Sequence, residues 1–136
     1  MISYRRGNDL DLDQVIELYR DSTLGERRPV DDRDRMATML ANANLVITAW
    51  DGDLLVGISR CLTDFAYVTY LSDLAVRLSY QRRGIGKQLI DETEGACPSA
   101  YITLLAAPKA VNYYPHAGFE PHPSAWIRRP APPASS

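Results

Sequence analysis

The chain of 136 residues contains only two cysteines, Cys61 and Cys97, which do not form a C-x-x-C pair. This scarcity argues against a disulfide-stabilised secreted domain, and we expect both thiols to be free in a reducing compartment. The sequence also lacks an apolar run near the ~18 residues that a membrane span needs, and it lacks a charged-then-apolar leader. We therefore expect a cytoplasmic protein that does not bind membranes.

The chain has no strong excess of one charge. Its net charge is −2, with 24% charged and 46% hydrophobic residues. This balance gives no overall attraction to nucleic acid or to anionic lipid, so we expect neither as a partner. The two histidines, His116 and His122, have no cluster of Cys or carboxylate residues around them, and no metal site is predicted. The length suits one domain with a real core.

Two common phosphate-binding patterns are also missing, because the chain has neither GxGxxG nor GxxxxGK[ST]. It has instead the segment QRRGIGK at residues 81–87, between an apolar run that ends at Val76 and an amphipathic helical pattern. A glycine loop that begins a helix presents backbone N–H groups without intrahelical partners, and the helix dipole adds positive charge. Gly84 and Gly86 have no Cβ to hold a ligand away. The segment therefore predicts a phosphate-binding loop.

The first half of the chain predicts a strand, two helices and a hairpin. We expect a strand at 2–5, a helix from Leu12 capped by Asp11 or Asp13, a loop at 25–32 and a short helix around 36–40. Apolar runs at 45–50 and 54–62 flank the turn Asp51-Gly52-Asp53, which is a strong hairpin signal. Gly57 within the second run predicts a bulge or a close backbone approach.

The second half predicts a strand at 66–76, a helix from 85 to about 95, a strand at 101–106, a short helix at 107–116 and a last strand at 126–128. The strands on either side of the helix are expected to be parallel neighbours joined by a right-handed crossover. Trp50 and Trp126 are expected in the core or at a dimer interface. The fold class is therefore α/β with a mixed sheet, as one domain over 1–129 followed by a disordered tail at 130–136.

Gln81-x-x-Gly84-x-Gly86 resembles the pyrophosphate-binding Q/R-x-x-G-x-G/A segment of the GNAT N-acetyltransferase superfamily. The order β-α-α-β-β-β-α-β-α-β is similar to the fold of that family up to about Arg129. The resemblance implies an antiparallel meander followed by a parallel strand pair that splays apart, with acetyl-CoA in the gap. It implies cofactor contacts from Leu74, Ala75, Val76, Arg82, Arg83, Gly84, Ile85, Gly86 and Lys87.

The segment AVNYYPHAGFE at 110–120 resembles the A-x-x-F-Y-x-x-x-G-F-E segment of the same family. The resemblance implies that Tyr114 is the general acid that protonates the departing thiolate, and that Tyr113 is a packing residue. Without it, both tyrosines would be interpreted as amphipathic core residues. It also implies that the N–H of Val76 polarises the thioester carbonyl.

The general base stays open. Asp73 and Tyr70 lie on the strand that borders the expected cleft, and Asp73 either deprotonates the amine through water or only hydrogen-bonds backbone beside a strand distortion. Ala107 stands where many family members have an Asn that contacts the cofactor, and the strand at 101–105 carries no Glu.

The resemblance implies direct transfer of an acetyl group from acetyl-CoA to a primary amine of a small molecule or peptide. A non-catalytic acyl-CoA-binding regulatory or interaction module is the alternative, and a nucleotide-binding domain with the same loop is a third hypothesis. The mixed charges of the first two helices do not indicate which amine accepts the acetyl group. A homodimer through the segment around Trp126 stays open.

Overall fold

A five-stranded sheet with strands in sequential order lies within residues 1–105 of the structure, a computed structural model that describes residues 1–131. The strands are β1 (Ile2–Arg6), β2 (Leu45–Asp51), β3 (Leu54–Thr63), β4 (Val68–Val76) and β5 (Tyr101–Thr103). β1 to β4 are antiparallel neighbours, and β5 lies parallel to β4. The predicted meander, the hairpin at 51–53 and the parallel pair are thus confirmed.

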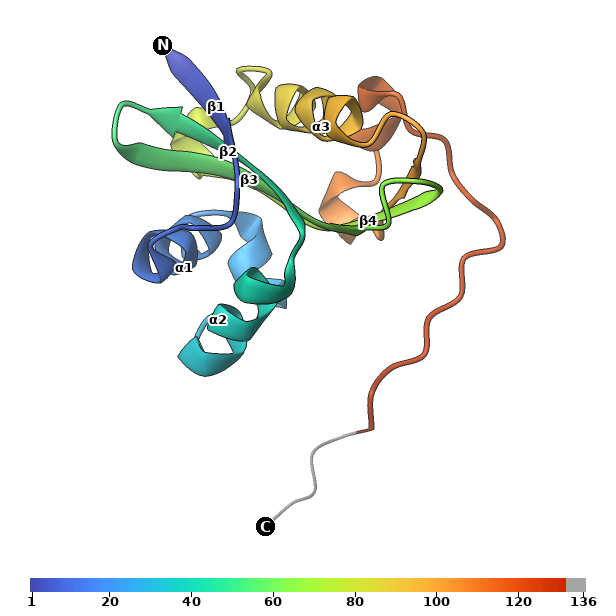
Figure 1. Ribbon diagram of the computed structural model, residues 1–136, viewed down its shortest axis with the longest axis horizontal. Helices are drawn as coiled ribbons and strands as arrows, with labels where there is room; N and C mark the ends of the chain where they lie inside the picture. The colour runs from blue at the N-terminus through green and yellow to red at the C-terminus, as the bar shows by residue number, and fades with distance from the viewer. Residues whose placement is uncertain (132–136) are drawn as a thin grey trace. The chain divides into compact units, whose positions relative to one another are not determined.

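Three α-helices cover the two faces of this sheet. They are α1 (Leu12–Arg20), α2 (Arg33–Asn42) and α3 (Ile85–Ala96). Asp11 caps α1 by accepting a hydrogen bond from the Asp13 N–H, and Asp32 caps α2 by accepting one from the Arg35 N–H. Helices α1 and α2 lie on one face of the sheet and α3 lies on the other (Figure 1). The loop expected at 25–32 begins within a short 3₁₀ helix, Thr23–Arg27.

The larger apolar core lies between the sheet and the helices α1 and α2. It is formed by buried residues of both layers: Val15, Ile16, Leu18, Tyr19, Leu24, Met36, Leu40, Ala43, Val46, Trp50, Leu55, Ile58 and Ala75. The core position of Trp50 is confirmed. Cys61 and Cys97 are both buried free thiols, as expected from the sequence.

Helix α3 sits very close to the sheet at Gly57. A Cβ atom at this position would lie 3.0 Å from Leu89 Cδ1 and 3.3 Å from Ile85 Cγ2. The close approach expected at Gly57 is confirmed. The adjacent residue, Val56, is the extra residue of a β-bulge, since Ala49 pairs with Gly57 and Trp50 with Leu55.

The chain divides into two units, Met1–Leu105 and Ala106–Ser136. The described part of the second unit, residues 106–131, contains two 3₁₀ helices, Pro108–Ala110 and Tyr114–Ala117. The prediction of one helix over 107–116 was therefore wrong. Pro115 lies inside the expected helix and has no N–H for a continuous α-helical ladder.

The prediction of a strand at 126–128 was also wrong, because the last strand within residues 1–131 ends at Thr103. Trp126 is 94% exposed and is not a core residue. Prolines at 121, 123 and 130 flank this short run and cannot donate to a sheet ladder. β5 is shorter than the predicted 101–106. Of the predicted tail, residues 130 and 131 carry no regular structure and 132–136 lie outside the described residues.

No helix within residues 1–131 is long and apolar enough to cross a bilayer. The same residues contain no group of three or more His, Cys, Asp or Glu side chains arranged to hold a metal ion.

Candidate functional site

The parallel strands β4 and β5 separate soon after they begin. Their pairing runs from Val68 opposite Tyr101 to Tyr70 opposite Thr103, whereas β4 continues to Val76. Residues 71–76 therefore have β3 on one side and no strand on the other. The splay expected between these strands is confirmed, and Tyr70 marks the point where it starts.

The open side of β4 presents backbone hydrogen-bonding groups. The Arg77 N–H donates to the Val56 carbonyl at 2.9 Å, so these two residues face each other across the β3–β4 ladder. Because antiparallel pairing alternates, the backbone groups of Ala75 also face β3, and those of Leu74 and Val76 face away from it. An extended ligand with amide groups can pair with such an edge as an added strand.

A β-bulge interrupts β4 just before this open section. Asp73 pairs with Arg60 and Leu71 pairs with Cys61, so Ser72 is the extra residue. Without the bulge, Tyr70 and Asp73 would point to opposite faces, because side chains alternate along a strand. The bulge places them on the same face. Tyr70 is 40% exposed there.

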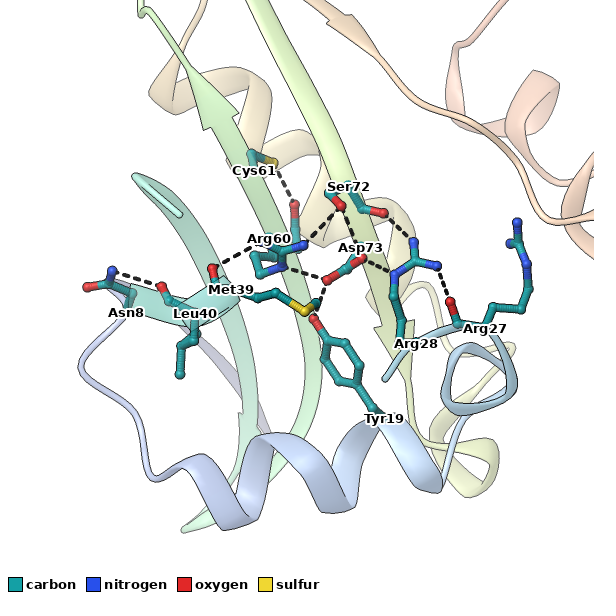
Figure 2. Close-up of polar contacts among 11 residues, drawn as sticks. Asn8, Tyr19, Arg27, Arg28, Met39, Leu40, Arg60, Cys61, Ser72 and Asp73 are labelled. Atoms are coloured by element: carbon teal, nitrogen blue, oxygen red, sulfur yellow. Dashed lines mark hydrogen bonds and ion pairs between the residues drawn. The ribbon is translucent and has the colours of Figure 1, made fainter. Parts of the chain in front are cut away.

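Asp73 lies at the centre of a buried polar network on this face (Figure 2). Its Oδ2 accepts hydrogen bonds from Arg60 Nε at 2.5 Å and from the Tyr19 hydroxyl at 2.6 Å. Its Oδ1 accepts from Arg28 Nε at 2.6 Å and from the Ser72 hydroxyl at 3.2 Å. The side chains of Asp73 and Arg60 are 0% and 9% exposed. The carboxylate is thus desolvated, and each of its oxygens accepts a hydrogen bond from an arginine.

The surroundings of Asp73 stabilise its ionised form. Burial acts to raise its pKa, but the Arg60 charge, the hydrogen bonds from Arg60 and Tyr19, and the Arg28 charge outweigh burial and lower the pKa below its usual value. The pKa of Tyr19 is raised well above 10 by burial and then by the negative charge of Asp73. A buried carboxylate with a lowered pKa is a weak proton acceptor at neutral pH.

The glycine loop leads from the end of β4 into the start of α3. Gly84 is the N-cap of α3 with φ +78°, and nothing lies within 4 Å of the position where a Cβ would stand. No side chain caps this helix, and its first turn carries no acidic residue. The first intrahelical bond runs from the Gln88 N–H to the Gly84 carbonyl at 3.0 Å, so the N–H groups of residues 85–87 have no intrahelical acceptor. This geometry is that of a helix N-terminus able to hold an anion, and phosphate binding there stays a prediction.

Side chains of the loop fix it to the strand. Gln81 Nε2 donates to the Val76 carbonyl at 3.0 Å, which joins the loop to the open edge of β4. The Arg83 guanidinium lies 4.8 Å from the centre of the Tyr80 ring. Lys87 pairs with Asp91, one turn further along α3, at 3.0 Å. The residues predicted to bind the cofactor thus lie at the end of β4, in the glycine loop and in the first turn of α3.

Tyr114 belongs to the second unit, Ala106–Ser136. Its ring packs edge-on against Tyr113 at 5.3 Å and against Phe119 at 5.5 Å, measured between ring centres. The proposed role of Tyr114 therefore rests on the sequence resemblance.

Sequence reasoning missed the partners of Asp73, namely Tyr19, Arg28 and Arg60. They come from α1, the segment after the 3₁₀ helix, and β3, so no local spacing connects them. Arg60 gave one usable signal, because an arginine inside the apolar run at 54–62 must find a buried partner.

The sequence profile of the family described as "Acetyltransferase (GNAT) domain" matches residues 22–129 of this chain. The chain therefore belongs to the GNAT acetyltransferase family. A GNAT family acetyltransferase from Streptococcus pneumoniae has a similar structure, with a TM-score of 0.77 and 29% identity, covering 96% of this chain and 100% of that one. A family that transfers acetyl groups from acetyl-CoA agrees with the uncapped N-terminus of α3 and the open strand edge.

Other similarities are more distant. An aminoglycoside N-acetyltransferase solved in complex with CoA shares the fold, with a TM-score of 0.72 and 19% identity over 96% of this chain and 95% of that one. The histone acetyltransferase TAP1 of Glycine max is 28% identical over 136 residues, which include 90% of this chain. The chain spans 57% of the length of that relative.

Proposed function

We propose that this protein transfers the acetyl group of acetyl-CoA directly to a primary amine of a small molecule or peptide. The observation that carries the proposal is the open edge of β4 beyond Tyr70, which adjoins the uncapped N-terminus of α3. Phosphate groups would lie on the N–H groups of residues 85–87, and the amide-bearing arm would pair with Leu74 and Val76. Arg82 and Arg83 add positive charge at the phosphate end.

The family match spans both units of the chain, since it covers residues 22–129. This supports the proposal that the two units together form one acetyltransferase domain over 1–129.

The cysteines favour direct attack by the amine over a covalent acyl-enzyme. Cys61 and Cys97 are buried, and burial raises the pKa of the Cys61 thiol to about 11. A thiol of this kind is almost fully protonated at neutral pH, and the thiolate is the nucleophile. We therefore propose that the amine nitrogen forms the new bond to the acetyl carbon while the C–S bond breaks, without a cysteine intermediate. The thiolate of CoA leaves and takes up a proton, and the attacking nitrogen releases one proton to water.

Residues of β4 and of the second unit have proposed roles in this step. The N–H of Val76 faces the open side of β4 and would pair with the amide-bearing arm, and the N–H of Leu74, nearer the bulge, would polarise the thioester carbonyl. Tyr114 would give its proton to the departing thiolate. Tyr70 would border the expected cleft at the point where β4 and β5 separate. We assign Asp73 a positioning role, because its carboxylate is enclosed by Arg28, Arg60 and Tyr19.

The proposal is tested by release of free CoA from acetyl-CoA with a panel of amines, alongside calorimetric binding of CoA. We expect turnover with at least one amine class, and a CoA affinity that exceeds the affinity for ATP or NAD. Tight CoA binding without turnover on any amine would support a non-catalytic binding module instead.

The role of Tyr114 has a matched control in its neighbour. We expect Tyr114→Phe to lower kcat about 10²–10⁴-fold, which is the usual contribution of a general acid, with little change in melting temperature. Tyr113→Phe, which removes a hydroxyl one residue away, should keep most of the activity. Equal activities of the two variants would show that Tyr114 is not the acid.

A further inference from the structure

Arg28 is held at the bulge where the open edge of β4 begins. Its Nε donates to Asp73 Oδ1 at 2.6 Å and its Nη2 donates to the Ser72 carbonyl at 2.7 Å (Figure 2). Its Nη1 donates to the Arg27 carbonyl at 2.8 Å. A guanidinium has five N–H donors, so these three bonds leave one further N–H on each terminal nitrogen. The side chain is 20% exposed, whereas Asp73 beside it is fully buried.

The charges of this network do not balance. One carboxylate, Asp73, is shared by two guanidinium groups, Arg28 and Arg60. Arg60 alone would neutralise Asp73, so the network carries one excess positive charge, and Arg28 is its more exposed member. The adjacent Arg27 is exposed and takes part in none of the ion pairs found among residues 1–131, and Glu26 pairs with neither arginine. An anionic group from outside the chain would complete the balance.

The bulge is also where the acyl end of the cofactor would arrive under the proposed function. With the phosphates at residues 85–87, the arm has to run back along β4 from Val76 toward Ser72. The four steps from Val76 to Ser72 span about 13 Å of strand. The thioester would therefore approach the bulge, and the amine that attacks it would stand next to Arg28.

We propose that Arg28, with Arg27 beside it, selects an acceptor that carries a carboxylate close to its reactive amine, as a free amino acid does. The planar guanidinium with one remaining N–H on each terminal nitrogen matches the two oxygens of a carboxylate. This inference rests on the proposed acetyl transfer and adds to it the chemical class of the acceptor. Arg28 binds and orients the carboxylate while the amine reacts.

The experiment compares acceptors that differ only at the carboxylate. A set of amino acids is assayed with acetyl-CoA, each beside its carboxamide and its decarboxylated amine. We expect the wild-type kcat/KM for the acid to exceed that for the carboxamide by about 10- to 100-fold, the discrimination that one hydrogen bond to a charged group supplies.

Variants assign this preference to the arginines. Arg28→Gln should raise KM for the acid and remove most of the preference, with the KM for acetyl-CoA unchanged, and Arg28→Lys should keep part of it. Arg27→Gln leaves the hydrogen bonds to Asp73 in place. It therefore tests whether positive charge beside the acceptor supports the preference for acids, even if Arg28→Gln folds poorly. Arg35→Gln removes an exposed charge from α2 and is the control for net charge alone.

The inference is overturned if the wild type uses carboxamides as well as acids, or if Arg27→Gln and Arg28→Lys both keep the full preference. In either case continued turnover of amines would leave the proposed function intact. Absence of turnover with every amine would overturn the proposed function and this inference with it.

Discussion

Replacement of Asp73 by Asn separates a positioning role from a role as general base. Asn keeps the shape of the side chain but removes the negative charge that compensates the positive charges of Arg28 and Arg60. The side chain of Arg60 is only 9% exposed. Breaking a buried ion pair by removing one partner costs about 3–5 kcal/mol, because the other charge stays buried without compensation. Against a total stability of about 5–15 kcal/mol for a domain, this is a severe loss.

The loss is measured by urea unfolding followed by far-UV circular dichroism, at pH 7 and with CoA absent. We expect a lower midpoint at an unchanged slope, and a fall in melting temperature of about 10–20 °C. Arg60→Met in the Asp73→Asn background removes the buried charge and should restore part of the stability. Asp91→Asn breaks the exposed pair with Lys87 and should cost less than about 1 kcal/mol.

If Asp73 is instead the general base, Asp73→Asn should lose activity without a loss of stability. If Asp73→Asn unfolds at the wild-type urea concentration but loses acetyl transfer and the acidic limb of its pH–rate profile, the positioning role is refuted. The comparison needs no knowledge of the natural acceptor, because any amine that turns over can serve.

Three further predictions concern packing, the glycine loop and pH. Gly57→Ala places a methyl group 3.0 Å from Leu89 Cδ1, and we expect a loss of about 1–3 kcal/mol in urea unfolding; an unchanged midpoint would contradict the close approach. Gly84→Ala forces φ +78° on a residue with a Cβ, which costs about 1–2 kcal/mol of conformational free energy. We expect calorimetry to show weaker binding of CoA to this variant. Gly95→Ala in α3 is the control and should keep the affinity for CoA. Since the folded pKa of Asp73 lies below the unfolded value of about 3.9, its stabilisation is complete above pH ~4 and is lost as the pH falls through the folded pKa. Since the folded pKa of Tyr19 lies above about 10, its stabilisation is present below pH ~10 and is lost as the pH rises further. Urea midpoints from pH 3 to 11 check both limbs. Tyr19→Phe should remove the alkaline limb and also weaken the acid limb, because it removes a hydrogen bond that lowers the pKa of Asp73.

Local signals made most of the sheet predictable. The Asp51-Gly52-Asp53 turn defined the hairpin, and the helix between Val76 and Tyr101 required a crossover and hence a parallel pair. The glycine spacing located the start of α3. These features depend on neighbouring residues, so a single sequence is sufficient to find them.

The remaining features depend on contacts between distant segments or on the absence of hydrogen-bond donors. Tyr19 and Asp73 are 54 positions apart, and Arg28 and Asp73 are 45 apart, so no periodicity reveals their network. In the second unit, apolar runs indicated a helix at 107–116 and a strand at 126–128. Prolines within and around both runs remove the N–H groups that such elements need, and this effect was underestimated.

The open edge of β4 also bears on solubility. An unpaired strand edge is a template for association with the strands of other molecules, which leads to aggregation. Here the edge is blocked at both ends: Gln81 occupies the Val76 carbonyl, and Arg28 occupies the carbonyl of the bulged residue Ser72. The stretch left between them is too short and too irregular for a foreign strand to extend the sheet, yet it suits a single flexible arm.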